Sequence, residues 1–413
     1  MHKSITVFEH QSLRLGMGGF EKIHLAALQH FLGERRDFPY YSLIHQGVKF
    51  NEYVGVIQVG NLMIEILPKA DQGQDTDRWR RIFIGMLRAS GIMDLPAPSS
   101  SRLKLKPNAL LQLYFERYVR ELERLLHRGL TKKYRKTEGN LNAVKGRIVF
   151  SKQMQYNLVH QERVYSAYSE FSREHLLHQV LLKALKLLAN INSAPVLNSR
   201  IARLLTAFPE QVDVKVSASL FSRIMLNRST QHYGPALQIA RMLLLNFHPD
   251  VSRGQHDVLA ILFDMNVLWE RFVCKSLQRQ LPRLIPACLV EAQEQREFWQ
   301  SDGGKHLHIR PDIHIRIGDG GFYVIDTKWK NLDGRNPDIQ DLRQMYVYHR
   351  YYHSEKVAML YPGESDGYSG AFRALEYDAK VYSCTLMPVR VEDDILLMQQ
   401  ALAVKVAAWM SNK

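Results

Sequence analysis

Residues 310–330 read RPDIHIRIGDGGFYVIDTKWK, and this pattern predicts two β-strands around a glycine-rich turn, the first with alternating apolar and polar residues. Successive side chains of a strand point to opposite faces, so Asp326 and Lys328 share one face, roughly 7 Å apart. Asp312 lies on the polar face of the preceding strand, opposite a row of isoleucines. If the turn folds the two strands into a hairpin, these three side chains converge.

Two carboxylates that meet in this way repel each other unless a cation lies between them. Mg²⁺ is the natural candidate, because it prefers oxygen ligands, keeps several waters and binds phosphate. Such an ion can lower the pKa of a bound water and neutralise charge that develops on a phosphodiester. Lys328 would then orient or deprotonate the attacking water, or stabilise the developing charge, and the sequence does not choose among these roles. The alternative is a polar hairpin with an Asp–Lys pair on its surface.

Two flanking segments add candidate residues. Glu270 lies among apolar residues of segment 261–281, which periodicity predicts to be a helix, and a carboxylate in such surroundings needs a partner. In the helix predicted over 336–352, Gln344 shares one face with an aspartate three residues before it and a tyrosine four residues after it. An ordinary salt-bridging glutamate and a plain amphipathic helix are the alternatives.

The composition points to a polyanionic partner. Lys and Arg number 55 against 41 Asp and Glu, which gives a net charge of +14 and an isoelectric point near 9.5. Such an excess attracts nucleic acid. The clearest basic cluster lies in segment 131–150, where phosphate contact with some base stacking and a solvated loop are both compatible with the residues. The residues chosen there as DNA-binding candidates are Lys132, Lys133, Arg135 and Lys136.

Several classes of protein are disfavoured. The first residues lack the apolar core of a secretory signal, and no apolar run approaches the roughly 20 residues that span a bilayer. Cys274, Cys288 and Cys384 are far apart, so they predict neither a disulfide framework nor a zinc site, and a reducing cytoplasm is the expected compartment. No membrane partner is expected.

The sequence contains no motif for nucleotide binding by a P-loop and none for a histidine-bound metal. No G-x-x-x-x-G-K-[ST] sequence occurs, so we expect this chain to bind no nucleotide on its own. His306, His308 and His314 alternate along one predicted strand face without an H-E-x-x-H motif. We therefore expect these histidines to be exposed strand residues and not metal ligands.

The pattern along the chain predicts three regions and an α/β fold class. Residues 1–100 mix strands with helices, and residues 101–250 are mainly helical, with the basic segment between helices. Residues 251–413 alternate helices with strands, as a layered α/β domain does. A Pro/Ser-rich stretch at 96–107 is a candidate boundary. Strands are predicted within 4–10, 48–70, 305–317, 321–330 and 356–362, and helices within 20–32, 75–91, 110–130, 175–191, 236–247, 261–281 and 336–352.

The pair Pro311–Asp312 followed by Asp326-Thr327-Lys328 resembles the PD-(D/E)xK nuclease superfamily. An ordered series of segments extends the likeness over nearly the whole chain, which is similar to the McrC family, the nuclease subunit of McrBC modification-dependent restriction systems. These segments are GNLMIEILPKA (60–70), LNAVKGRIVFSKQM (141–154), EFSREHLLHQVLLKAL (170–185), LFDMNVLWERFV (262–273), RPDI (310–313), VIDTKWK (324–330), DLRQMYVY (341–348) and AMLYP (358–362).

This resemblance implies a restriction-endonuclease-like domain at 251–413 that cuts DNA. It assigns Asp312 and Asp326 as metal ligands, with Glu270 beside them, for Mg²⁺ or alternatively Mn²⁺. It makes Lys328 the catalytic lysine and Gln344 a supporting residue near the scissile phosphate.

The resemblance also implies a protein partner. The N-terminal part of such a subunit docks into a ring of the AAA+ GTPase McrB and stimulates its GTP hydrolysis, and the partner reads the 5-methylcytosine. We expect a DNA endonuclease subunit of a restriction complex that acts in phage defence. The alternatives are a standalone nuclease of repair or recombination, and a non-catalytic adaptor of an AAA+ ring. The PKA and KGRIVF segments argue against the first alternative, and the intact P-D…D-x-K motif argues against the second.

Overall fold

The chain forms two compact units, Met1–Leu110 together with Pro249–Lys413, and Leu111–His248. The predicted boundary at 96–107 lies outside the residues that the structure describes. The computed structural model describes residues 3–34, 40–69, 75–92, 109–192, 194–248, 257–318, 320–330, 332, 336–373 and 381–412.

The described residues of the N-terminal part of the first unit form two sheets and two α-helices. Its elements are β1 (Lys3–Phe8), β2 (Ser12–Arg14), the 3₁₀ turn η1 (Met17–Gly19), α1 (Lys22–Glu34), β3 (Tyr41–Ile44), β4 (Gly47–Phe50), β5 (Tyr53–Val59), β6 (Leu62–Leu67), α2 (Thr76–Ala89) and β11 (Val258–Asp264). One sheet has the neighbours β1-β6-β5-β11, and the other has the order β2-β4-β3. Gly55 of β5 has a φ of 143°, and a Cβ there would lie 2.1 Å from the carbonyl oxygen of Ile261, so β5 and β11 approach closely.

The C-terminal part of the first unit is a six-stranded mixed sheet with three helices and a separate two-stranded ribbon. Its elements are α9 (Met265–Leu284), β12 (Cys288–Ala292), β13 (Arg296–Gln300), β14 (His306–Ile309), β15 (Ile313–Ile317), β16 (Phe322–Thr327), α10 (Ile339–Tyr351), β17 (Lys356–Pro362), β18 (Tyr368–Ala371), β19 (Ser383–Val389) and α11 (Ile395–Ser411). The sheet order is β12-β15-β16-β17-β19-β18, and β13 pairs with β14 in the ribbon. Helix α10 packs on β16, β17 and β19, whereas α9 packs on β12, β16 and α11.

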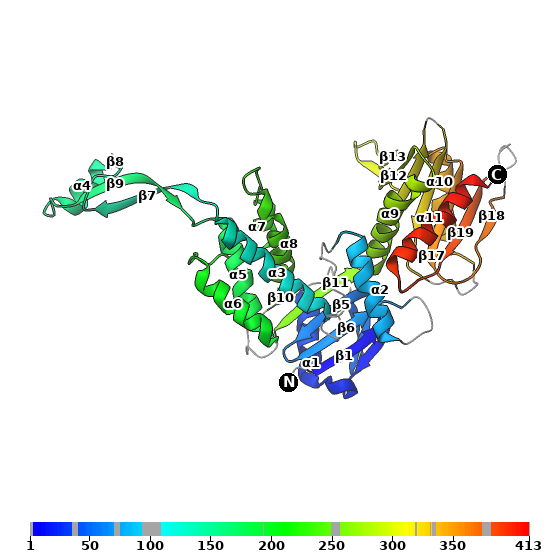
Figure 1. Cartoon of the computed structure of the whole chain (residues 1–413), viewed down its shortest axis with the longest axis horizontal. Helices are drawn as coiled ribbons and strands as arrows, with labels where there is room; N and C mark the ends of the chain where they lie inside the picture. Colours follow the sequence, from blue (N-terminus) through cyan, green and yellow to red (C-terminus); the bar gives the residue numbers. More distant parts are fainter. Residues whose placement is uncertain are drawn as a thin grey trace. The chain divides into compact units, whose positions relative to one another are not determined.

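The second unit combines a helical core with a long ribbon, in which β7 and β9 carry β8 and α4 at one end (Figure 1). Tyr118 of α3 donates a hydrogen bond to the carbonyl oxygen of Leu181 in α5, 2.6 Å away, inside the helical core. The elements are α3 (Ala109–Arg128), β7 (Lys133–Leu141), β8 (Arg147–Ile148), α4 (Phe150–Asn157), β9 (Val164–Ser172), α5 (Leu176–Ile191), α6 (Pro195–Ala207), α7 (Ala218–Ser222), the 3₁₀ turn η2 (Gln231–Tyr233), α8 (Gly234–Leu245) and β10 (Phe247–His248).

Most predicted elements are present, and two predictions about local structure are wrong. Segment 261–281 is not one helix, because pairing with β5 extends β11 to Asp264, whose side chain then caps α9. Segment 305–317 is not one strand: β14 ends before Pro311, and β15 begins after Asp312 in a different sheet. The basic segment 131–150, for which a solvated loop is one of two interpretations, contains β7, which pairs with β9 over nine residues.

Among the described helices, none combines the length and apolar character needed to cross a membrane. Cys274, Cys288 and Cys384 are buried free thiols.

Candidate active site

The hairpin of β15 and β16 brings the two aspartates of the motif together. Ile313 pairs with Ile325, so Asp312 before one strand and Asp326 near the end of the other lie opposite each other. Asp312 Oδ2 accepts hydrogen bonds from the amide and the hydroxyl of Thr327, at 2.7 and 2.8 Å. Burial nevertheless raises the pKa of Asp312 above its ordinary value. Both bonds use one oxygen of Asp312, and neither uses Oδ1.

Asp326 is a buried carboxyl group, with 1% of its surface exposed. Its Oδ2 lies 2.9 Å from Lys328 Nζ, an ion pair that lacks hydrogen-bond geometry, so this buried oxygen accepts no well-formed bond from the described residues. Burial, together with the charge of Asp312, raises the pKa of Asp326 to about 7, and this outweighs the opposing effect of the ammonium group.

Lys328 contacts carboxylates on two elements. Besides Asp326, its Nζ lies 3.7 Å from Asp341 Oδ1 and donates a hydrogen bond to Gln344 Oε1 at 3.4 Å. Burial alone lowers the pKa of Lys328, but the charges of Asp326, Asp341 and Asp312 raise it overall. The Lys328 side chain is therefore an ammonium group at neutral pH.

Helix α10 fastens the start of the motif through two side chains. Gln344 Nε2 donates to the hydroxyl of Tyr348 at 2.7 Å, and that hydroxyl donates to the carbonyl oxygen of Arg310 at 2.9 Å. The predicted helix face of Gln344 and Tyr348 thus lies against the motif. The same helix holds the residue before Pro311 and contacts Lys328.

Glu270 of α9 approaches the site from the side of Asp312. Its Oε1 accepts a hydrogen bond of 2.5 Å from Gln293 Nε2, and the backbone amide of Gln293 donates to the carbonyl oxygen of Asp312 at 3.1 Å. Burial, followed by the charge of Asp312, raises the pKa of Glu270. Gln293 has a left-handed backbone with φ of 58°, which is uncommon for a residue other than glycine.

Sequence reasoning missed Gln293 and also Glu9. The polar run around Gln293 resembles an ordinary loop, and only the fold places it between Glu270 and Asp312. Glu9 follows β1, and its Oε1 accepts hydrogen bonds from Trp329 Nε1 at 2.8 Å and from the amide of Lys69 at 2.7 Å. This contact joins Trp329, the residue after Lys328, to Glu9, which lies 320 positions earlier in the chain.

The carboxylates of the site are chemically suitable ligands for a Mg²⁺ ion. Among the described residues, no group of three or more His, Cys, Asp or Glu side chains is arranged to hold a metal ion. Mg²⁺ often uses only one or two carboxylates and completes its shell with waters and substrate phosphates. Asp312 and Asp326 are neighbouring carboxyl groups with raised pKa values, and their oxygens are hard ligands. The Oδ2 of Asp326 is buried and accepts no well-formed hydrogen bond from the described residues.

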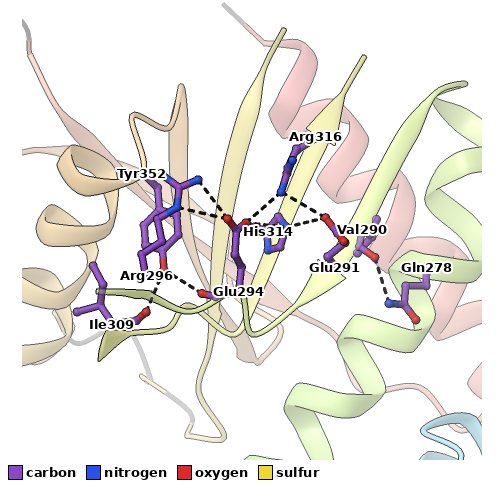
Figure 2. Close-up of polar contacts among 9 residues, drawn as sticks. All are labelled: Gln278, Val290, Glu291, Glu294, Arg296, Ile309, His314, Arg316 and Tyr352. Atoms are coloured by element: carbon purple, nitrogen blue, oxygen red, sulfur yellow. Dashed lines mark hydrogen bonds and ion pairs between the residues drawn. The ribbon is translucent and has the colours of Figure 1, made fainter. Parts of the chain in front are cut away.

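His314 is buried, whereas the sequence predicted an exposed strand residue. Only 1% of its surface is exposed, and its Nε2 lies 3.0 Å from Glu291 Oε2 and 3.1 Å from Glu294 Oε2 (Figure 2). The Phe322 ring stacks on the imidazole with 5.5 Å between the ring centres, so this face of β15 is covered. His306 and His308 are exposed, as predicted.

The basic cluster of the sequence lies on the ribbon of the second unit. Lys132, Lys133, Arg135 and Lys136 are all exposed. Arg135 forms an ion pair with Glu174, and Lys132 Nζ lies 5.5 Å from the centre of the Phe171 ring.

The C-terminal part is thus a mixed α/β structure whose central hairpin gathers two aspartates and a lysine. A family model described as "McrBC 5-methylcytosine restriction system component" matches residues 48–362, more than half of the chain. The chain belongs to this family.

Solved structures share the fold. A chain of the "refined half-complex from tetradecameric assembly of Thermococcus gammatolerans McrB AAA+ hexamers with bound McrC" has a TM-score of 0.73 and 18% identity, over 98% of this chain and 100% of that one. A chain of the Thermococcus gammatolerans McrBC complex determined by cryo-electron microscopy has a TM-score of 0.52 and 20% identity, over 67% of this chain and 87% of that one. No curated protein matches the chain.

Proposed function

We propose that this chain is the metal-dependent DNA endonuclease subunit of an McrBC-type restriction complex, and that residues 251–413 form its PD-(D/E)xK restriction-endonuclease-like domain. One observation carries the proposal: Asp312, Asp326 and Lys328 converge at the end of the β15–β16 hairpin, with Lys328 Nζ 2.9 Å from Asp326 Oδ2. Two neighbouring carboxylates whose pKa values are raised by burial, and for Asp326 also by the charge of Asp312, are typical of a functional site and suit a cation.

Asp312 and Asp326, with Glu270 beside them, would hold Mg²⁺ or alternatively Mn²⁺. The bound ion would supply an activated water and neutralise charge on the phosphodiester. Thr327 fixes the orientation of the Asp312 carboxylate through two hydrogen bonds. Gln293 fixes Glu270 and the backbone of Asp312 at the same time.

Lys328 would act as a positive charge and not as a base, because its neighbours keep it protonated. Its ammonium group can stabilise the charge that builds up on the phosphate oxygens as the bond to the leaving oxygen breaks. Gln344, which accepts a hydrogen bond from Lys328 at 3.4 Å, limits the positions that Nζ can take.

The test is the pair of variants Asp326→Asn and Asp326→Ala, assayed with Mg²⁺, long DNA and an AAA+ GTPase of the McrB type. Both should lose cleavage, while Asp302→Asn, in an exposed turn, should cut like wild type. A second readout is independent of cleavage: Mg²⁺ should raise the melting temperature of the wild type, and the gain should be smaller in Asp326→Asn. Wild-type cleavage by the Asp326 variants would contradict the proposal.

We further propose that an AAA+ GTPase of the McrB type is the partner. The Thermococcus gammatolerans half-complex that shares this fold consists of McrB AAA+ hexamers with bound McrC. Residues 1–100 remain the proposed docking region. The ribbon of the second unit adds a second candidate surface, because exposed apolar side chains in such number favour protein contact. They are Tyr134, Val144, Phe150, Met154, Tyr156, Leu158, Val159 and Phe171.

The ribbon surface can be tested by partner binding. Leu158→Asp and Val159→Asp place charge at side chains that are 74% and 85% exposed, so the fold should persist. Both should weaken co-purification with the GTPase and lower its stimulated GTP hydrolysis. Val196→Asp, at a side chain 83% exposed on α6, is the matched control. Undiminished binding by both ribbon variants would remove this surface from the proposal.

A further inference from the structure

A cavity of about 670 Å³ lies between the β13–β14 ribbon and helix α10. The ribbon side contributes Phe298, His308 and Arg310, and the helix contributes Gln340 and Arg343 among others. No lining residue is an aspartate or a glutamate. The cavity therefore presents two guanidinium groups, several amides and an aromatic ring without any negative charge.

The two arginines are available for a ligand. Arg310 and Arg343 are both exposed, and neither guanidinium forms an ion pair or a hydrogen bond with any residue in the described part of the chain. Other arginines of this part of the fold do have carboxylate partners, as Arg296 has in Glu294. The charge of Arg310 reaches Asp312 and Glu270, where it opposes the burial that raises both pKa values, but its planar guanidinium forms no ion pair among the described residues and is suited to bind phosphate oxygens.

The cavity adjoins the candidate active site at Gln344 and Arg310. Gln344 lines it and also accepts the hydrogen bond from Lys328 Nζ. Arg310 lines it and stands two residues before Asp312. A polynucleotide strand with a phosphodiester at the two aspartates would therefore extend directly into this cavity.

The wall of the cavity is held in place at the base of the ribbon (Figure 2). The hydroxyl of Tyr352 lies 2.9 Å from the carbonyl oxygen of Glu294 and 3.0 Å from that of Ile309. It therefore links the segment just before β13 to the end of β14. Arg296 lies 4.5 Å over the Tyr352 ring and pairs with Glu294 at 3.2 Å. A wall fixed in this way needs little ordering when a ligand binds.

We propose that this cavity binds the sugar–phosphate backbone of the DNA strand that is cut, next to the scissile phosphate. Arg310 and Arg343 contact phosphates, and Phe298 offers an apolar face to a sugar or base. The inference rests on the proposed endonuclease function and assigns the substrate contacts of that same site. Contacts of this kind position the strand and carry no base information.

The test is binding of the full chain to a fluorescent DNA duplex over a series from 50 to 200 mM salt. The double variant Arg310→Gln with Arg343→Gln is compared with Arg14→Gln combined with Arg279→Gln. The control removes the same charge from two exposed arginines that do not line the cavity. Each phosphate contact contributes about −0.9 to the slope of log K against log salt, so the cavity variant should have a slope about 1.8 less steep. The wild-type advantage over it should then shrink about 12-fold across the series.

Equal slopes for the cavity variant and the control would overturn the inference, as would a wild-type chain that does not bind the duplex at 50 mM salt. Asp326→Asn, measured beside them, separates the two proposals. If Asp326→Asn loses cleavage and the cavity variant keeps the control slope, only the DNA subsite is refuted. If Asp326→Asn still cuts, the endonuclease assignment fails, whatever the slopes are.

Discussion

Replacing Glu9 by Gln should flatten the dependence of melting temperature on pH. Glu9 is 3% exposed, and its Oε1 accepts two hydrogen bonds, from Lys69 and Trp329. Its Oε2 is buried without a hydrogen-bond partner among the described residues. Burial raises the pKa of Glu9 from 4.5 to about 7. The protein therefore holds a carboxyl group whose charged form is poorly solvated.

The sign and size of the effect follow from linkage. Between pH 4.5 and 7 the folded chain retains a proton on Glu9 that the unfolded chain has released. The stabilisation is therefore complete below the unfolded pKa and is lost as the pH rises through the folded pKa. Between pH 5 and 8 the loss from this one group is about 2.5 kcal/mol. For a unit of this size that corresponds to roughly 5 °C in melting temperature.

The assay compares melting temperatures of wild type and Glu9→Gln from pH 5 to pH 8. Other titrating groups affect both chains alike, so the difference between the two curves isolates Glu9. Relative to wild type, the variant should gain roughly 5 °C as the pH rises across this range. Glu210→Gln, at an exposed side chain, should run parallel to wild type. Parallel curves for Glu9→Gln would refute the reasoning, because they would mean that Glu9 is charged throughout the range.

Three further predictions concern activity and binding. Gln293→Ala removes the amide that holds Glu270, and it should raise the Mg²⁺ concentration for half-maximal cleavage at least about 10-fold; an unchanged Mg²⁺ titration would contradict the positioning role. The variant in which Lys132, Lys133, Arg135 and Lys136 become Ala should bind DNA with a flatter salt slope in filter binding, and an unchanged slope would assign these residues to the partner or to solvent. The purified chain should hydrolyse neither GTP nor ATP and should bind methylated and plain duplexes alike. It should also cut long DNA poorly without its partner, and efficient partner-free cutting would favour the standalone nuclease.

The hairpin could be predicted because its signals are local. The alternation of apolar and polar residues over 306–317, the proline before Asp312 and the glycine-rich turn indicate two antiparallel strands. A period of two then places Asp326 and Lys328 on one face, and the structure pairs them at 2.9 Å. The helix face of Gln344 and Tyr348 is equally local, because residues four apart are neighbours on any α-helix.

The contacts that support the site could not be predicted, because they join distant parts of the chain. Glu9 and Trp329 are 320 positions apart, and Glu270 and Gln293 are 23 apart, with an intervening helix end and a strand. His314 was misjudged for a related reason. Its strand has polar residues at alternate positions, which locally indicate an exposed face, but two glutamates from another segment contact the buried Nε2.

The misread segments share one property: each adjoins the candidate active site. The switch from β11 to α9 at Asp264 precedes Glu270 by six residues, and the break at Pro311 directly precedes Asp312. A continuous helix or a continuous strand would satisfy the local pattern better in both places. The secondary structure that the local sequence favours is expected to be overridden where the fold has to bring particular side chains together in one site. The break at Pro311 also exposes the carbonyl oxygen of Arg310 to Tyr348 and starts the wall of the cavity, so one irregularity serves both the aspartate and the DNA subsite proposed beside it.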